Sequence, residues 1–247
     1  MSQLLTFDGV SKLFANGVLA LDRISFGVAS GAFVSLVGPS GCGKSTILRL
    51  AAGLTPPTNG TIRWDGAKPR LGFVFQDPAL MPWSSVEKNV RLPLELLGMP
   101  EEASRRRVKD TLELVGLTSF AKAYPRELSG GMRMRVSIAR ALAVEPSVLL
   151  MDEPFAALDE FTRERLNDEL RNLWRARGLT ILFVTHSIYE SVYLSSRVLV
   201  MRPRPGRIIN DLDMSLPMER TAEYRHTSEY ADRCRALRDA LFEGAHA

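Results

Sequence analysis

The stretch that decides the fold is GAFVSLVGPSGCGKST, residues 31–46. Its first half is a short apolar run with β-branched residues between glycines, which predicts a buried strand at 31–38. Its second half, 38–46, fits the spacing G-x-x-x-x-G-K-[ST] of a phosphate-binding loop. A helix over 44–52, closed by Gly53, is expected to follow. A strand, a glycine-rich turn and a helix in this order form the setting in which such a loop binds phosphate.

The residue types inside this loop suit a nucleotide. Glycines let backbone N–H groups close around phosphate oxygens, which a Cβ would obstruct. Lys44 brings a positive charge to the β- and γ-phosphates, and the Ser45 hydroxyl is a ligand for Mg²⁺. Cys42 is interpreted as a small residue whose backbone binds, with a thiol that makes the loop a target for thiol reagents. The expected nucleotide contacts are Gly38, Pro39, Ser40, Gly41, Cys42, Gly43, Lys44, Ser45 and Thr46.

Strand-like and helical segments alternate along most of the chain. Further strands are expected at 4–10, 19–28, 58–66 (with hairpin character), 70–76, 147–154, 179–186, 197–201 and 207–214. An all-helical stretch, roughly 86–145, interrupts the alternation, and further helices are expected at 160–177 and, as a polar amphipathic tail, at 219–244. Strands that alternate with helices predict an α/β fold with a mostly parallel sheet.

Four side chains suited to metal, phosphate or proton chemistry follow predicted strands. Ligands of parallel α/β sheets bind at the carboxyl ends of the strands, where these residues stand. Asp152 is the candidate Mg²⁺ ligand, and Glu153 is the candidate base that orients and deprotonates a water molecule. His186 is expected to contact the γ-phosphate, and the Gln76 amide to contact Mg²⁺ or that water.

A second pattern suited to phosphate lies at LSGG, residues 128–131. Ser129 is expected to cap a helix that runs to about Ala143, and the glycines let a ligand approach the backbone. A helix N-terminus of this kind binds anions. The chain therefore carries two phosphate-binding patterns, and the second needs a phosphate of its own.

Composition and charge narrow the class of protein. The 247 residues are 45% hydrophobic and 24% charged, as in globular proteins, and no apolar run reaches the roughly 18 residues of a membrane helix. The start lacks a signal-peptide pattern, and Cys42 and Cys234 are too few for a disulfide framework, so a reducing, cytoplasmic setting is expected. The net charge of +4 is compatible with nucleic acid or an anionic membrane surface as a partner. The clusters 105–107 and 202–207 are interpreted as solvated surface instead.

Taken together, the motifs resemble those of the ATP-binding subunits of ABC transporters, over nearly the whole chain. They occur in the family's order: the phosphate loop, the Q-loop Gln76, the signature 128–131, the acidic strand end 151–154, the D-loop ending at Asp159, and the switch His186. Several independent short motifs in the correct order are highly specific. Phe14 stands where the family stacks an aromatic residue, usually Tyr, on adenine, and Met132 replaces the commoner Gln of the signature.

The resemblance implies a P-loop NTPase fold of the ABC type with a mostly parallel core sheet, an N-terminal antiparallel β-subdomain and a helical insert. It implies one ATP-binding domain over 4–244, with the core and β-subdomain at about 4–85 and 146–218. The helical signature subdomain then covers about 86–145 and the helical tail about 219–244.

The resemblance also answers whose phosphate the second pattern holds. In the family two such domains pack head to tail, so Ser129, Gly130 and Gly131 are expected to contact ATP bound to the partner chain. Asp159 is expected to help there, although it is also placed to cap the helix at 160–177. The implied catalytic residues are Glu153, His186 and Gln76, and the implied Mg²⁺ ligands are Ser45, Gln76 and Asp152.

Two stretches, FQDPALMPWSSVEKNV (75–90) and MRPRPGRI (201–208), are similar to the nitrate, sulfonate and taurine group of bacterial importers. That group implies a separate integral membrane permease, a substrate-binding protein acting with it, and a place at the cytoplasmic face of the inner membrane. Trp83 and an apolar stripe of Leu92, Leu94 and Leu97 are candidates for the groove that docks the permease, or for ordinary packing inside the insert.

Three other classes of protein compete with this interpretation. A non-transport ABC ATPase acting on DNA or ribosomes usually carries a coiled-coil insert or two nucleotide domains, and neither is present in the sequence. A kinase would need neither LSGG nor the late histidine. A non-hydrolysing regulatory subunit would not need Lys44, Asp152, Glu153 and His186 together. We therefore expect no nucleic-acid partner.

Overall fold

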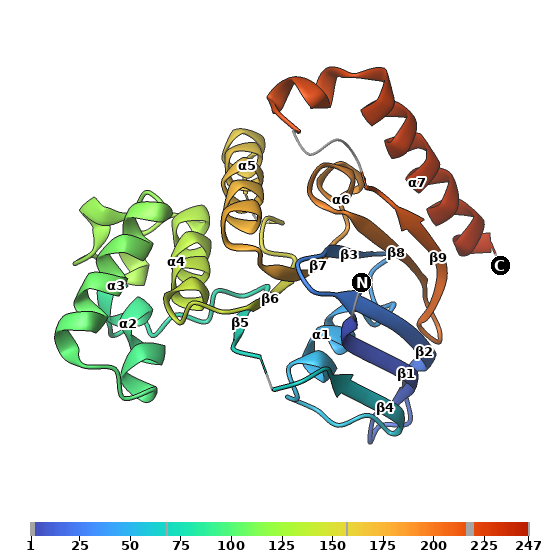
Figure 1. Ribbon diagram of the computed structural model, residues 1–247, viewed down its shortest axis with the longest axis horizontal. Coiled ribbons are helices and arrows are strands. Elements are labelled where there is room, and N and C mark those ends of the chain that lie inside the picture. The colour runs from blue at the N-terminus through green and yellow to red at the C-terminus, as the bar shows by residue number, and fades with distance from the viewer. Residues whose placement is uncertain (1–2, 68, 157, 216–219, 247) are drawn as a thin grey trace. The chain divides into compact units, whose positions relative to one another are not determined.

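The computed structural model describes residues 3–67, 69–156, 158–215 and 220–246 (Figure 1). It divides into two compact units, one made of 1–69 and 165–247 and the other of 70–164. The boundary between them falls inside helix α5 (Glu160–Arg177), which has the bounds expected from the sequence. Among the described helices, none is long and apolar enough to cross a membrane.

The first unit opens with a three-stranded antiparallel sheet, as expected for the β-subdomain. Strands β1 (Gln3–Leu13), β2 (Leu19–Ala29) and β4 (Asn59–Trp64) run in the order β2-β1-β4. The Phe7 and Phe26 rings stack with centroids 4.6 Å apart between β1 and β2. This aromatic pair adds to the cross-strand contacts that stabilise such a sheet.

The hairpin predicted at 58–66 is wrong, because the segment forms the single strand β4 against β1. Phe7 lies opposite Ile62 and Leu5 opposite Trp64 in this pairing. Nine residues would make two strands of about three residues each, and an isolated two-stranded hairpin is marginal in water. The long strand β1 offers a better partner, so tertiary pairing overrides the local turn signal.

The first unit also holds the strand that carries the phosphate loop. Strand β3 (Phe33–Val37) pairs in parallel with β7 (Thr180–Thr185) on one side and β8 (Arg197–Arg202) on the other. Strand β9 (Arg207–Asp213) closes this edge antiparallel to β8. All residues of β3 and β7 are buried, which is typical of parallel strands covered on both faces.

Further helices lie in the first unit together with most of α5. Helix α1 (Lys44–Ala51) follows the phosphate loop, and Gly53 just beyond it has the left-handed φ of +72° expected of a closing glycine. Helix α6 (Ile188–Leu194) follows β7, and α7 (Ser228–His246), after the 3-10 turn at Ala222–His226, lies against α6 and β8 (Figure 1). The tail helix expected at 219–244 therefore begins at Ser228, and residue 219 lies outside the described residues.

The second unit contains two parallel strands and three mutually packed helices, drawn mainly in green in Figure 1. Strand β5 (Leu71–Val74) pairs in parallel with β6 (Val148–Asp152). Helices α2 (Val86–Leu96), α3 (Glu101–Leu114) and α4 (Gly130–Ala143) occupy the predicted helical stretch, with 3-10 turns at Thr118–Phe120 and Pro125–Glu127. The mostly parallel α/β class predicted from the sequence is confirmed by these pairings.

Candidate nucleotide-binding site

The predicted site residues fall into two groups, one on each unit. The first unit carries Phe14, the loop 38–46 and His186, and the second carries Gln76, 129–131, Asp152, Glu153 and Asp159. Within each unit, parallel strand pairing places the strand-end residues at a common edge. Val37 is paired with Thr185, so the loop and His186 leave the sheet at the same edge.

Lys44 is the buried cation of the phosphate loop. The residue is 5% exposed, and its ammonium donates to the carbonyls of Gly38 (2.8 Å) and Pro39 (3.1 Å). The loop therefore folds back around its own lysine, while Pro39, Ser40 and Gly41 at its tip are exposed. Among the described residues, the hydrogen-bond partners of this buried ammonium are neutral, and a buried cation with neutral partners favours an anion beside it, because its charge is not compensated.

Glycines shape the loop because side chains have no room there. A Cβ on Gly38 would lie 2.5 Å from the Met201 carbonyl oxygen, and Gly41 and Gly43 have left-handed φ values of +79° and +95°. Ser45 and Thr46, at the start of α1, are half-buried. Backbone N–H groups are thus available in a turn that L-residues rarely adopt, and these features fit a polyphosphate.

Gly206 braces the loop from behind, and sequence reasoning missed it. A Cβ on Gly206 would lie 2.2 Å from the Cys42 carbonyl oxygen and 2.7 Å from that of Ala20. The Gly206 N–H donates to Ala20, and its carbonyl accepts from the Asp22 N–H, both at 3.0 Å. The only signal in the sequence was the glycine within MRPRPGRI, whose partners cannot be seen without the fold.

Cys42 packs inward and is shielded from solvent. Its thiol is fully buried and lies 3.8 Å from the Lys44 ammonium. Burial raises the pKa of the Cys42 thiol, against the opposing effect of Lys44. Since the thiolate is the reactive form, the sensitivity to thiol reagents expected from the sequence is not favoured by this environment.

Phe14 presents an exposed ring, 38% accessible, after the end of β1. The Lys12 ammonium lies 5.4 Å from its centroid. An exposed aromatic face on a short turn is available for stacking on a base.

His186 lies in a tightly bonded turn between β7 and α6. The imidazole is exposed, whereas its neighbour Thr185 is buried and donates to the Glu190 carboxylate at 2.5 Å. The Ser187 N–H donates to the Thr185 hydroxyl at 3.0 Å, and the Ser187 hydroxyl caps α6 by accepting from the Glu190 N–H at 3.2 Å. The backbone on both sides of His186 is therefore fixed.

The two acids stand at the end of β6 in the second unit. Asp152 is buried, while Glu153 is half-buried and has a left-handed φ of +45°, which non-glycine residues rarely adopt. Such strain is concentrated at functional positions. Val74 of β5 is paired with Met151 of β6, so the exposed Gln76 leaves the sheet at the same edge as these acids.

The signature stretch forms the helix start that the sequence predicts. The Ser129 hydroxyl accepts from the Met132 N–H at 3.2 Å and caps α4. A Cβ on Gly131 would lie 3.0 Å from a methyl carbon of Leu158, so the signature and the D-loop are in close contact. Half-buried Met132 takes part through its backbone, while Ser129 is exposed.

Asp159 has the capping role that the sequence suggested as an alternative. Its carboxylate accepts from the Thr162 N–H at 2.9 Å, in the first turn of α5. This hydrogen bond lowers the pKa of the Asp159 carboxyl. Ala157 of the D-loop lies outside the described residues.

The expected apolar stripe is only partly exposed. Leu94 is fully buried within the helical unit, so of the two interpretations ordinary packing inside the insert holds for this residue. Leu96 is 79% exposed instead. A groove of about 370 Å³ is lined by Leu71, Gly72, Phe73, Phe75, Ala79, Leu92, Pro93, Leu96, Arg140, Ala141 and Val144.

Trp83 is held outward by a buried asparagine. Its side chain is 75% exposed on the turn before α2. Asn89, fully buried in α2, accepts from the Met81 N–H at 2.7 Å and donates to the carbonyls of Met81, Ser84 and Ser85. This fourfold bonding fixes the turn, and an asparagine on the apolar face of α2 was the signal available in the sequence.

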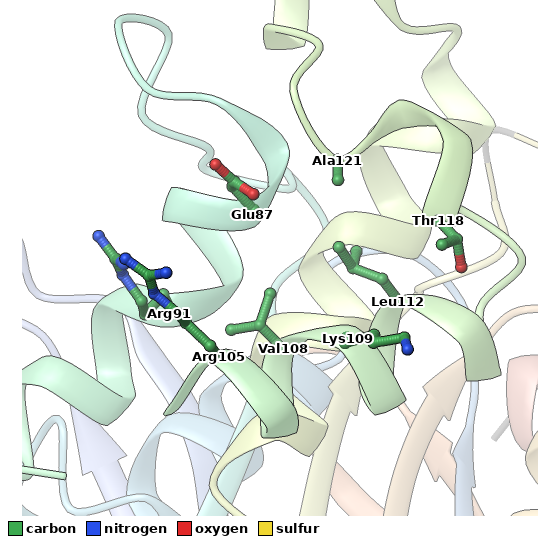
Figure 2. Close-up of a pocket in the computed structure, with 8 residues that line it drawn as sticks. All are labelled: Glu87, Arg91, Arg105, Val108, Lys109, Leu112, Thr118 and Ala121. Atoms are coloured by element: carbon green, nitrogen blue, oxygen red, sulfur yellow. The ribbon is translucent and has the colours of Figure 1, made fainter. Parts of the chain in front are cut away.

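A second pocket of about 430 Å³ lies among the helices of this unit and holds none of the predicted site residues. Figure 2 shows its lining side chains, which are Glu87, Arg91, Arg105, Val108, Lys109, Leu112, Thr118 and Ala121. Arg91 and Arg105 are each paired with a glutamate one helical turn away, Glu95 and Glu101, at 2.6 Å. These paired charges agree with a solvated surface at 105–107.

A family profile described as ABC transporter matches residues 21–156, which include the phosphate loop, the signature and both acids. The chain belongs to the ABC transporter family. The match confirms the family resemblance that the order of the motifs indicates.

Two curated relatives and one solved structure illustrate where the chain stands in the ABC family. The aliphatic sulfonates import ATP-binding protein SsuB of Bacillus cereus is 45% identical over 225 residues, 88% of each chain. The taurine import ATP-binding protein TauB of Rhizobium johnstonii is 46% identical over 220 residues, 85% of this chain and 84% of that one. A dimeric post-hydrolysis state of the ATP-binding cassette MJ0796, bound to ADP and Pi, superposes with a TM-score of 0.79 at 33% identity, covering 85% of this chain and 98% of that one.

The brace behind the loop of this ABC cassette is testable by adding one methyl group. Gly206→Ala should lower the free energy of unfolding by about 1–3 kcal/mol, because backbone oxygens on two sides must move. Chemical denaturation measures the loss. The control is Gly178→Ala, where no atom lies within 4 Å and only the φ of +59° is unfavourable. A Gly206→Ala protein as stable as the wild type would show that the turn between β8 and β9 does not support the phosphate loop.

Proposed function

We propose that this chain is the ATP-hydrolysing subunit of a bacterial ABC importer for a sulfonate, taurine, nitrate or a similar small solute. The observation that carries the proposal is a second helix N-terminus suited to binding phosphate, at Ser129, in addition to a complete phosphate loop. A kinase uses one such site, whereas a cassette that dimerises around ATP needs two. The import names of the two curated relatives support the kind of transport and the solute class.

The proposed ATP-binding residues comprise the phosphate loop, Phe14 and the side chains at the strand ends. The loop 38–46 binds the phosphates through its N–H groups, with Lys44 on the β- and γ-phosphates and Phe14 on the adenine. Ser45, Gln76 and Asp152 supply oxygen ligands of the kind that Mg²⁺ prefers. Bound Mg²⁺ would neutralise charge on the phosphates, and the residues that would hold it offer a hydroxyl, an amide and a buried carboxylate.

In this proposal Glu153 accepts a proton from the attacking water, and His186 and Gln76 hold the water and the γ-phosphate in line. General-base catalysis contributes about 10²–10⁴-fold in rate. Glu153 has a left-handed φ of +45° directly after β6, a strained conformation of the kind found at functional positions. The bonded turn around His186 keeps its imidazole at the strand edge where the loop also lies.

The proposed assembly is a head-to-tail dimer in which Ser129, Gly130 and Gly131 contact ATP bound to the other copy. Asp159 lies beside Leu158, which touches Gly131, so the D-loop and the signature would act as one surface. The dimeric ADP-bound relative supports this arrangement. Because the γ-phosphate would join the two copies, hydrolysis would release them and convert chemistry into motion.

The proposed membrane partner is an integral permease that docks on the groove beside α2. Leu92 and Leu96 line that groove, and Trp83, exposed on the turn before α2, is proposed as a further contact. Arg140 of α4, which also lines the groove, donates to the carbonyls of Pro78 (2.7 Å) and Ala79 (2.8 Å). The chain would act at the cytoplasmic face of the inner membrane, with a substrate-binding protein acting on the permease.

The alternative of an ABC ATPase acting on nucleic acid or ribosomes is not proposed. The compared relatives carry import names. In both arginine clusters a described cation is paired with an acid, Arg107 with Glu145 and Arg207 with Asp22. These pairs reduce the positive field that phosphate backbones require.

The base can be tested by removing its charge. Glu153→Gln should lower the ATPase turnover of the purified chain by about 10²-fold or more and leave ATP affinity within about twofold, because only the proton acceptor is lost. Steady-state ATPase assays and calorimetric ATP binding measure the two quantities. Wild-type turnover in this variant would remove Glu153 from the role of base.

The shared site can be tested in the background of Glu153→Gln, which should accumulate an ATP-bound dimer. Adding Ser129→Arg puts a long side chain where a small hydroxyl must meet a phosphate, so the dimer should be lost while the monomer still binds ATP. Light scattering after size exclusion, with Mg²⁺ and ATP, measures the dimer. The matched control is Arg126→Ala, close in sequence but outside the signature. If the Glu153→Gln protein dimerises equally with and without Ser129→Arg, the result would contradict a site shared between two copies.

The permease contact can be tested at the exposed tryptophan. Trp83→Ala should keep basal ATPase activity, because the side chain is 75% exposed and lies outside the nucleotide motifs. Copurification of the permease and transport in reconstituted vesicles should fall about tenfold, as for an aromatic anchor at an interface. Phe242→Ala, an exposed aromatic on α7, is the control. An equal loss of basal ATPase would mark Trp83 as part of the fold instead.

A further inference from the structure

Helix α6 is too short to hold its own position. It has seven residues, Ile188–Leu194, and begins two residues after His186. Isolated helices of this length are unstable in water, so contacts from outside decide where such a helix lies. Whatever holds α6 therefore also holds the histidine at its start.

Arg220 holds the C-terminal end of α6. Its guanidinium donates to the carbonyls of Val192 (2.7 Å), Tyr193 (2.6 Å) and Ser195 (2.9 Å), which are the last carbonyls of the helix and its cap. It also donates to Met214 at 2.5 Å. These carbonyls carry the negative end of the helix dipole, so a cation there is favourable in both hydrogen bonding and charge.

This arginine is buried rather than part of the surface. The residue is 8% exposed. Burial, together with the nearby charge of Arg171, lowers the pKa of Arg220 to about 10, so the guanidinium stays charged at neutral pH. Arg171 in α5 donates in turn to the Arg220 carbonyl at 3.0 Å, which fixes the backbone that carries the guanidinium.

The segment after Arg220 fixes α6 at two further points. The Tyr230 hydroxyl, from α7, donates to the Tyr189 carbonyl in the first turn of α6 at 3.0 Å. The Arg225 guanidinium lies 3.7 Å from the ring centroid of Tyr193 and pairs with Asp168 of α5 at 2.7 Å. The C-terminal segment 220–230 therefore holds both ends of α6, and Figure 1 shows α7 running beside it.

We propose that Arg220 is a positioning residue for ATP hydrolysis, because it caps α6 and thereby sets the place of His186 at the nucleotide edge. The inference rests on the role of His186 in the proposed function. Arg220 contacts neither the phosphate loop nor Phe14 through its described hydrogen bonds, so it acts through α6. The C-terminal segment 220–230 would therefore contribute to ATP turnover in addition to packing on the core.

Two substitutions at Arg220, and a double-mutant cycle of Arg220 with His186, test whether Arg220 positions the histidine. Arg220→Met keeps an unbranched apolar side chain, shorter than that of arginine, and removes every donor. Its ATPase turnover should fall about tenfold, since a misplacement of about 1 Å costs up to about 10²-fold. Its ATP affinity should stay within about twofold. Arg220→Lys should recover part of the turnover, because an ammonium reaches fewer of the carbonyls than the planar guanidinium.

The cycle distinguishes positioning from a general loss of structure. In the His186→Ala background, Arg220→Met should change turnover by less than about twofold, because the two residues act as one unit. Independent losses in both backgrounds, an unchanged turnover in the folded single variant, or a parallel loss of ATP affinity would each overturn the proposal. The control Arg233→Met, on α7 and paired with Glu229, should have no effect in either background.

Two further measurements keep the proposal testable if Arg220→Met does not fold. Tyr230→Phe removes only the hydroxyl bonded to Tyr189, and should lower turnover about two- to threefold in wild type and not in His186→Ala. Amide exchange over 187–195 should be faster in Tyr230→Phe and Arg220→Lys than in Arg233→Met, and equal rates would overturn the proposal. Wild-type turnover in His186→Ala would instead overturn the role of His186 in the proposed function, a failure that is visible before any change at Arg220.

Discussion

The parallel pairing of β3 with β7 is the constraint on which the candidate phosphate-binding edge of the first unit depends. Both strands are wholly buried, and Val37 at the end of one is in register with Thr185 at the end of the other. Because the two strands end in register, the loop after β3 and the histidine after β7 arrive at one edge together.

The phosphate loop then obtains its shape from packing rather than from its own sequence alone. Lys44 is bonded to two loop carbonyls, Met201 presses on Gly38, and Gly206 fits against the carbonyl of Cys42. The hairpin between β8 and β9 therefore forms the back wall of the loop. A rigid loop pays little to order itself around a phosphate, which is the advantage of a preorganised site.

In the second unit, parallel strand pairing likewise brings polar side chains to one edge of the sheet. The pairing of Val74 with Met151 brings Gln76 to the edge where Asp152 and Glu153 stand. On the same unit, the capped start of α4 contacts Leu158 through Gly131. Each unit thus carries part of the motif set. The C-terminal segment adds a support outside the motifs, where Arg220 replaces the stability that a seven-residue helix lacks.

The sequence by itself determined the fold class, the family and nearly every strand and helix, because strong hydrophobic periodicity, glycines at turns and capping residues are local signals. The bounds of α5 and the cap at Ser129 are examples. Only the tertiary structure decided that β4 pairs with β1, that Leu94 is buried while Leu96 is exposed, and that Gly206 and Arg220 support the site. Those outcomes depend on partners distant in the chain, such as Arg220 and Val192, and a single sequence carries no local signal of which distant residues will meet.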